Sequence, residues 1–147
     1  MAPNVIKPYK GDPFVGHLST PVSDSAFVRE YLSLLPINRP DLTAKLRGRE
    51  IGMAHGYFLF GPFAELGPLR DSNVGDLAGL ISAIALVIIA ATGMRLYGNT
   101  AYDIGNKPNE DLKTKQGWAD LSKGFVIGGA GGAFFAFLLT QTLGFLS

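Results

Sequence analysis

The chain has 147 residues, a formal net charge of +1 and no cysteine. The near-neutral charge gives no sign of a nucleic-acid surface, and the lack of cysteine excludes disulfides, iron–sulfur clusters and thiol chemistry. Apolar residues make up 47% of the sequence and the mean hydropathy is +0.21, which is high for a water-soluble domain of this size. We therefore expect an integral membrane protein that forms one domain over residues 1–147.

The N-terminal region, residues 1–41, is expected to form an arm and a surface helix on one side of the membrane. Prolines and glycines recur through the first 22 residues. They predict an extended, irregular arm, because proline fixes φ and lacks an N–H donor. His17 in this arm is interpreted as an ordinary surface or hydrogen-bonded residue. Residues 23–35 predict a short amphipathic helix capped by Ser23, which suits either a membrane interface or a small core beneath the arm.

Residues 42–61 predict a long helix with Asp41 as its N-cap and Pro62 at its end. The hydropathy of this segment is marginal for a membrane span, because its apolar run lies between Glu50 and Glu65. The helix can cross if the basic residues near its start snorkel to one interface and Glu50 is neutralised or ligated.

Two further spans are predicted over residues 77–97 and 124–145. The core of each carries no charged residue over the roughly 18 residues needed to cross hydrocarbon. Residues 124–145 also contain glycines at four-residue spacing, which favours close helix packing. The fold class is therefore all-α, with three transmembrane helices.

Polar segments connect these spans over residues 62–76 and 98–123. In the second segment, a short helix is expected to begin near Thr114 and lead to Trp118. Every lysine and arginine except Arg70 lies before the first span, near its start, or in and around the second connection. The positive-inside rule then places the N-terminus on the cytoplasmic or stromal side and the C-terminus on the lumenal or exterior side.

The first predicted span carries the only histidine within any span, His55, together with Glu50. In a helix these residues are about 140° apart around the axis and about 7.5 Å apart along it, so each suits a separate metal. Gly48, Gly52 and Gly56 lie near His55 on one face. Two interpretations stay open. A flat magnesium macrocycle lies against this bare face with His55 as its axial ligand, or the glycines form a helix-packing seam and His55 hydrogen-bonds to another helix.

No nucleophile set, phosphate-cradling loop or pocket with paired carboxylates can be recognised in the sequence, and we do not expect an enzyme. Two facing histidines for a haem are also lacking within the spans. The remaining classes are a pigment-binding structural subunit, a pigment-free scaffold that packs through glycine seams, and a small transport subunit.

Three motifs carry a resemblance to a known family: GDPFVGHLSTPVSDS at 11–25, RGREIGMAHGYFLFGP at 47–62 and LGPLRDS at 66–72. They resemble photosystem I reaction centre subunit XI (PsaL), and the similarity extends to about residue 140. The resemblance implies a non-catalytic subunit of the thylakoid membrane that binds antenna chlorophyll a and beta-carotene. Its implied partners are the photosystem I core, small membrane subunits, lipid and neighbouring copies of itself.

The resemblance also implies individual site residues. Glu50 and His55 match the family's axial ligands of chlorophyll magnesium, and Pro68 (by its carbonyl) and Asp71 (by its carboxylate) match a calcium site between protomers. The trimer-forming members carry further C-terminal residues, whereas this chain stops at Ser147. We therefore expect the oligomer contact and the calcium site to differ from theirs, and the choice between monomer, trimer and tetramer stays open.

Overall fold

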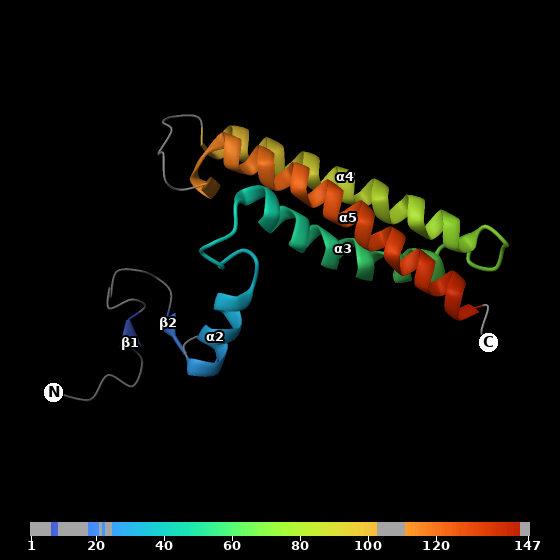
Figure 1. Ribbon diagram of the computed structural model, residues 1–147, viewed down its shortest axis with the longest axis horizontal. Coiled ribbons are helices and arrows are strands. Elements are labelled where there is room, and N and C mark those ends of the chain that lie inside the picture. Colours follow the sequence, from blue (N-terminus) through green and yellow to red (C-terminus); the bar gives the residue numbers. More distant parts are fainter. Residues whose placement is uncertain (1–6, 9–17, 21, 23–24, 103–110, 145–147) are drawn as a thin grey trace. The chain divides into compact units, whose positions relative to one another are not determined.

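The computed structural model describes residues 7–8, 18–20, 22, 25–102 and 111–144, and these are mainly helical (Figure 1). The chain divides into two compact units, Met1–Pro40 and Asp41–Ser147. The expectation of an all-α fold is confirmed. The helices are α2 (Ala26–Leu34), α3 (Ala44–Leu66), α4 (Gly75–Ala101) and α5 (Lys115–Gly144), with a short 3₁₀ turn, η2 (Asp111–Lys113), before α5.

The N-terminal unit contains two very short strands and one helix. Strands β1 (Lys7–Pro8) and β2 (Leu18–Ser19) pair antiparallel, so the arm that we expected to be irregular contains a short strand pairing. The predicted amphipathic helix is present as α2. Its N-cap is Ser25, whose side chain accepts a hydrogen bond of 3.3 Å from the backbone N–H of Val28. Ser23, the predicted cap, and His17 lie outside the described residues.

Helix α3 differs from its predicted bounds at both ends. Thr43 rather than Asp41 is its N-cap, and α3 continues through Pro62 to Leu66 instead of ending at residue 61. A proline removes one backbone donor, but tertiary packing can outweigh that loss. Phe60 and Ala64, which flank Pro62, are each only 4% exposed in a core cluster with α4 and α5. This packing accounts for the helix continuing past the proline.

The other two long helices also extend beyond the predicted spans. Helix α4 runs from Gly75 to Ala101, and α5 is a single helix from Lys115, so the separate short helix expected near Thr114 is wrong. Thr114 caps α5 by accepting a 2.9 Å hydrogen bond from the N–H of Gly117. Near the end of α4, the side chain of Trp118 packs directly on Gly98. The two helices therefore support each other beyond their apolar stretches.

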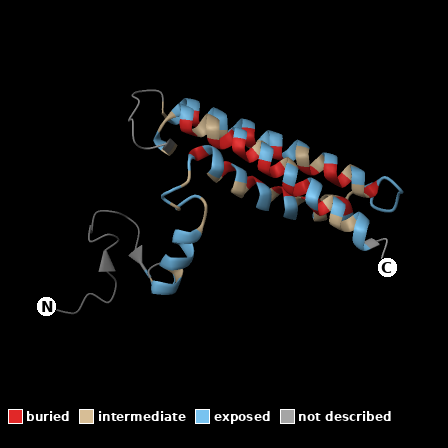
Figure 2. Cartoon of the chain, viewed as in Figure 1, coloured by how far each residue is buried: buried red, intermediate tan, exposed pale blue. Residues whose placement is uncertain are grey.

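Within the second unit, α5 packs along both α3 and α4 (Figure 1). The buried residues line the faces where these three helices meet (Figure 2). One core cluster joins Phe60 and Ala64 to Leu80 of α4 and Ala133 of α5. A second cluster surrounds Val87, which is fully buried.

The outer faces of the three long helices carry large apolar side chains. Examples are Phe58 on α3 (54% exposed), Ile89 on α4 (66%) and Phe135 on α5 (56%). Among the described residues, α4 and α5 are the two helices long and apolar enough to cross a membrane. Helix α3 does not reach the same hydropathy because of the charges near its two ends, so its role as a span stays a prediction.

Candidate functional site

The glycines of α3 form a packing seam with α5. A Cβ atom on Gly48, Gly52 or Gly56 would overlap backbone atoms of α5. All three glycines are buried. Of the two interpretations of these glycines, the packing seam is therefore confirmed, and the open face expected for a macrocycle beneath His55 is wrong. The bare face of α3 is filled by a neighbouring helix.

Helix α5 contributes the matching half of this seam, as its glycine spacing predicted. A Cβ on Gly124, Gly128 or Gly132 would overlap the backbone carbonyls of α3. Small residues on both helices let the two backbones approach closely, which is how helices associate in lipid without a hydrophobic driving force. This seam holds the segment with Glu50 and His55 rigidly against α5.

The ring of His55 is oriented by its own helix. His55 is half-buried, and its Nδ1 lies 2.8 Å from the backbone carbonyl oxygen of Ile51, one turn earlier. A carbonyl can only accept, so Nδ1 carries the proton in this contact and donates it. In the neutral imidazole the Nε2 atom then keeps its lone pair, which is the tautomer that a metal-ligating histidine adopts.

Two aromatic rings flank His55. The centroid of the Phe58 ring is 5.1 Å away and that of the Phe125 ring on α5 is 5.4 Å away, both tilted relative to the imidazole. Phe125 is 2% exposed, so it forms a fixed wall beside the histidine. The contact with Ile51 follows from helical periodicity and could have been predicted. The contact with Phe125 could not, because it depends on how α3 and α5 pack.

Glu50, the second candidate ligand, is half-buried on the same helix. Because α3 is continuous from Ala44 to Leu66, Glu50 and His55 are about 7.5 Å apart along the axis and about 140° apart around it. The two side chains therefore suit two separate ligands and not one shared ion. The described residues also contain no cluster of three or more acidic, histidine or cysteine side chains that could hold a metal ion.

The candidate calcium residues lie in the connection between α3 and α4. The carboxylate of Asp71 is 84% exposed and lies 3.4 Å from the guanidinium of Arg70, which also donates to the carbonyl of Gly67. Pro68 is exposed in the same turn. Calcium takes six to eight oxygen ligands. This loop alone supplies one carboxylate already paired with a cation, so a calcium site here needs further ligands from elsewhere.

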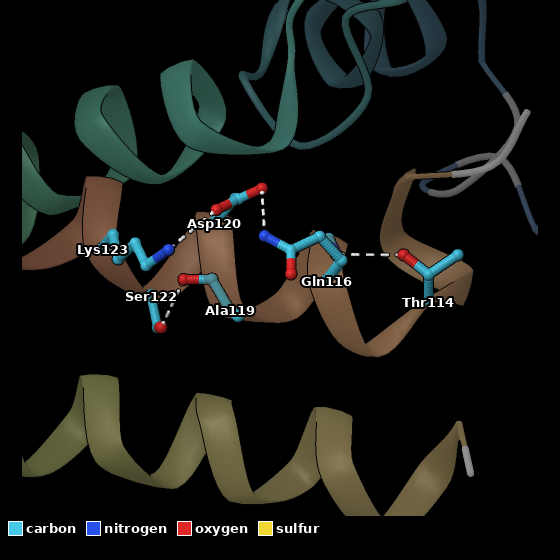
Figure 3. Close-up of polar contacts among 7 residues, drawn as sticks. Thr114, Gln116, Ala119, Asp120, Ser122 and Lys123 are labelled. Carbon is cyan, nitrogen blue, oxygen red and sulfur yellow. Dashed lines mark hydrogen bonds and ion pairs between the residues drawn. The ribbon is translucent and has the colours of Figure 1, made fainter. Parts of the chain in front are cut away.

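A polar network outside the predicted site residues lies at the start of α5 (Figure 3). The carboxylate of Asp120 accepts hydrogen bonds from Gln116 (2.9 Å) and from the Lys123 ammonium (3.3 Å). The bond from Gln116 lowers the pKa of Asp120, and the Lys123 and Lys45 charges lower it further. A cavity of about 340 Å³ between the starts of α3 and α5 includes Asp120 and Lys45 in its lining. The hydrogen bonds of this network lie within α5, and Lys45 of α3 acts on Asp120 through its charge.

Comparison with known proteins decides the family. The sequence matches the family described as PsaL, Photosystem I reaction centre subunit XI, over residues 5–145. The chain belongs to the subunit XI family. Among its relatives, the photosystem I reaction center subunit XI of Thermosynechococcus vestitus is 51% identical, with 96% of this chain and 91% of the relative aligned. The protein of the same name from Cyanidioschyzon merolae is 54% identical, with 91% of this chain and 94% of the relative aligned.

Membership of the subunit XI family gives the general role of the chain. The family is a structural subunit of a complex and not an enzyme. The described residues of the site comprise a glycine seam, an imidazole oriented by its own helix and a half-buried carboxylate.

Proposed function

We propose that this chain is a chlorophyll- and carotenoid-binding structural subunit of photosystem I in the thylakoid membrane. It contributes antenna pigments and contacts to the neighbouring subunits of the complex. The family match over residues 5–145 supports the assignment to the complex. The proposal of pigment binding rests on the ligand chemistry of α3.

The observation that carries pigment binding is the geometry of His55. With Nδ1 donating to the Ile51 carbonyl, the ring of His55 is held in one orientation, and in the neutral imidazole Nε2 carries the free lone pair. A neutral imidazole held by a carbonyl acceptor suits axial ligation of a magnesium macrocycle. A chlorophyll bound there supplies light absorption and excitation transfer, while His55 and its two aromatic neighbours position it.

Glu50 is the proposed axial ligand of a second pigment, which it would bind through a carboxylate oxygen and not through a nitrogen. A carboxylate oxygen is a hard ligand, which matches a hard metal centre such as magnesium. Glu50 is half-buried on α3, the helix that also carries His55. We propose chlorophyll a at both ligands and beta-carotene against the exposed apolar faces.

The proposed pigment sites require α3 to lie in the membrane as a third span. Two observations support this. The middle of α3 carries exposed apolar side chains such as Met53 (50%) and Phe58 (54%), as expected for contact with lipid or pigment. The seam holds α3 along α5, which is apolar enough to span by itself. With three spans, the distribution of basic residues places the N-terminus on the stromal side and the C-terminus on the lumenal side.

For the oligomer, we propose contacts between neighbouring copies, with lipid around the helices. Pro68 and Asp71 are the candidate calcium residues of such a contact. Asp71 supplies only one carboxylate, and that carboxylate is already paired with Arg70. Because calcium takes six to eight oxygen ligands, we propose that the remaining ligands come from a neighbouring copy or subunit.

The second candidate function is a pigment-free scaffold that packs through its glycine seam. A specific observation favours it, since the glycines of α3 and α5 do pack backbone to backbone. The two functions differ in what His55 does. In the scaffold, the imidazole only packs between Phe58 and Phe125.

The test is a His55→Leu variant in the intact complex isolated from the native membrane. We expect one chlorophyll fewer per copy of this chain, measured by pigment extraction and by low-temperature absorption. Met53→Leu is the matched control, because Met53 is an exposed apolar residue on the same helix. Unchanged pigment content in His55→Leu, with the complex assembled, would favour the scaffold.

A further inference from the structure

A groove between the second half of α3 and the second half of α5 includes neither His55 nor Glu50 in its lining, although Phe58, which flanks His55, is part of that lining. Its volume is about 660 Å³, and its lining includes Tyr57, Gly61 and Glu65 from α3 and Leu139 and Thr140 from α5. This volume falls within the roughly 300–1,000 Å³ of small-molecule and cofactor sites. The lining is mainly apolar, with few polar groups, as in such sites.

At Gly61, no neighbouring residue among those described covers the helix surface that lines the groove. A Cβ atom built on Gly61 has no neighbouring atom within 4 Å. This contrasts with Gly52 and Gly56 of the same helix, where α5 fills the space. The bare helix surface that a flat ring needs is therefore absent beneath His55 but present at Gly61, about 1.7 turns further along α3.

Glu65 supplies the ligand atom. It lies four residues after Gly61, which is about 6 Å along the helix and about 40° around it, so the two residues share one face. Among the described residues that line the groove, Glu65 is the only acidic or basic one. Thr140, a further polar residue there, donates its hydroxyl proton to the carbonyl of Ala136 (3.0 Å). The carboxylate is therefore the strongest ligand that the groove offers.

We propose that this groove binds a flat, five-coordinate magnesium macrocycle, a chlorophyll beyond those of Glu50 and His55, with Glu65 as its axial ligand. The inference rests on the proposed function, because it requires a pigment-binding subunit. A hard carboxylate oxygen, an open glycine surface and apolar walls such as Tyr57 and Leu139 are what such a ring requires. A lipid tail in the same groove would use the walls but would not need the carboxylate.

The test uses two variants in the intact complex isolated from the native membrane. Glu65→Leu removes the ligand oxygen, and Gly61→Leu fills the groove without changing the carboxylate. Glu30→Leu and Gly93→Leu are the matched controls. Glu30 is an exposed acid on α2. Gly93 is a helical glycine that also has no atom within 4 Å of a built Cβ.

We expect both groove variants to lose one chlorophyll per copy by pigment extraction, with a matching change in the absorption difference spectrum, and both controls to keep full pigment content. Because Gly61 faces open space, Gly61→Leu should assemble even if Glu65→Leu does not. Full pigment content in the groove variants, or density for a lipid in the groove, would overturn the inference. If His55→Leu loses pigment and the groove variants do not, this inference fails while the proposed function stands. If none of them loses pigment, the proposed function fails as well.

Discussion

Replacing Gly52 with alanine adds one methyl group at the centre of the α3–α5 seam. In the structure, a Cβ at this position lies 2.8 Å from the backbone nitrogen of Gly129 and 2.9 Å from the carbonyl carbon of Phe125, and it overlaps the Phe125 carbonyl oxygen. Non-bonded contacts of carbon are most favourable at roughly 3.5–4.0 Å. The helices must therefore separate by about 1 Å, because backbone atoms cannot rotate away as a side chain can.

The overpacking energy of Gly52→Ala is partly offset by the higher helix propensity of alanine. Overpacking a well-packed contact costs about 1–3 kcal/mol, and we expect the upper half of this range because both sides of the contact are backbone. Alanine in a helix gains roughly 0.5–1 kcal/mol over glycine. The net expectation is a loss of about 1–2.5 kcal/mol in the free energy of unfolding. Gly131→Ala on α5 should instead gain roughly 0.5–1 kcal/mol, because a Cβ there meets nothing within 4 Å.

The measurement is denaturant-induced unfolding of the full chain in detergent micelles, followed by circular dichroism, for wild type and both variants. The two alanine variants make the same chemical change in a helix, so opposite signs can only come from the surroundings of the two glycines. Equal shifts for Gly52→Ala and Gly131→Ala would refute the reasoning that the seam is closed by backbone contact.

Two further predictions concern the polar end of α5. Trp118→Phe removes the 2.8 Å hydrogen bond from the indole Nε1 to the carbonyl of Leu112. The loss of this bond should lower the free energy of unfolding by about 1 kcal/mol. An unchanged free energy of unfolding in the same assay would show that the bond contributes nothing. Gln116→Ala should raise the pKa of Asp120 toward its ordinary value of 3.8, because the Gln116 hydrogen bond is the main cause of its lowering. Since the folded-state pKa is the lower one, the stabilisation is present above pH 3.8 and is lost as the pH falls through the folded-state pKa. A carboxyl NMR titration of both proteins would check this, and an unchanged pKa would contradict the assigned cause.

Several features of the fold could be predicted from local sequence. The long uncharged runs in α4 and α5 identify them as potential spans, because hydropathy is a property of composition. The glycine spacing of α5 indicated close packing, which its contacts with α3 confirm. Helix ends were less predictable. Asp41 and Thr43 are both good caps in isolation, and only the folded backbone selects Thr43.

The continuation of α3 through Pro62 was not predictable, because it depends on Phe60 and Ala64 being buried against other helices. The same limit applies to the site. The types and spacing of Glu50 and His55 already indicate two separate axial ligands, since both follow from the helical period. The contact between the rings of Phe125 and His55 could not be predicted, because Phe125 lies in a distant part of the chain.

The sequence alone determined that the chain is helical, largely apolar and equipped with an imidazole and a carboxylate in one helix. These properties depend on residue type and on spacing within one segment. Only the tertiary structure decided which glycines are open. Gly52 and Gly56 are covered by α5 while Gly61 faces empty space. All three lack a side chain, so only the path of the neighbouring helix distinguishes a packing seam from a surface that can receive a ligand.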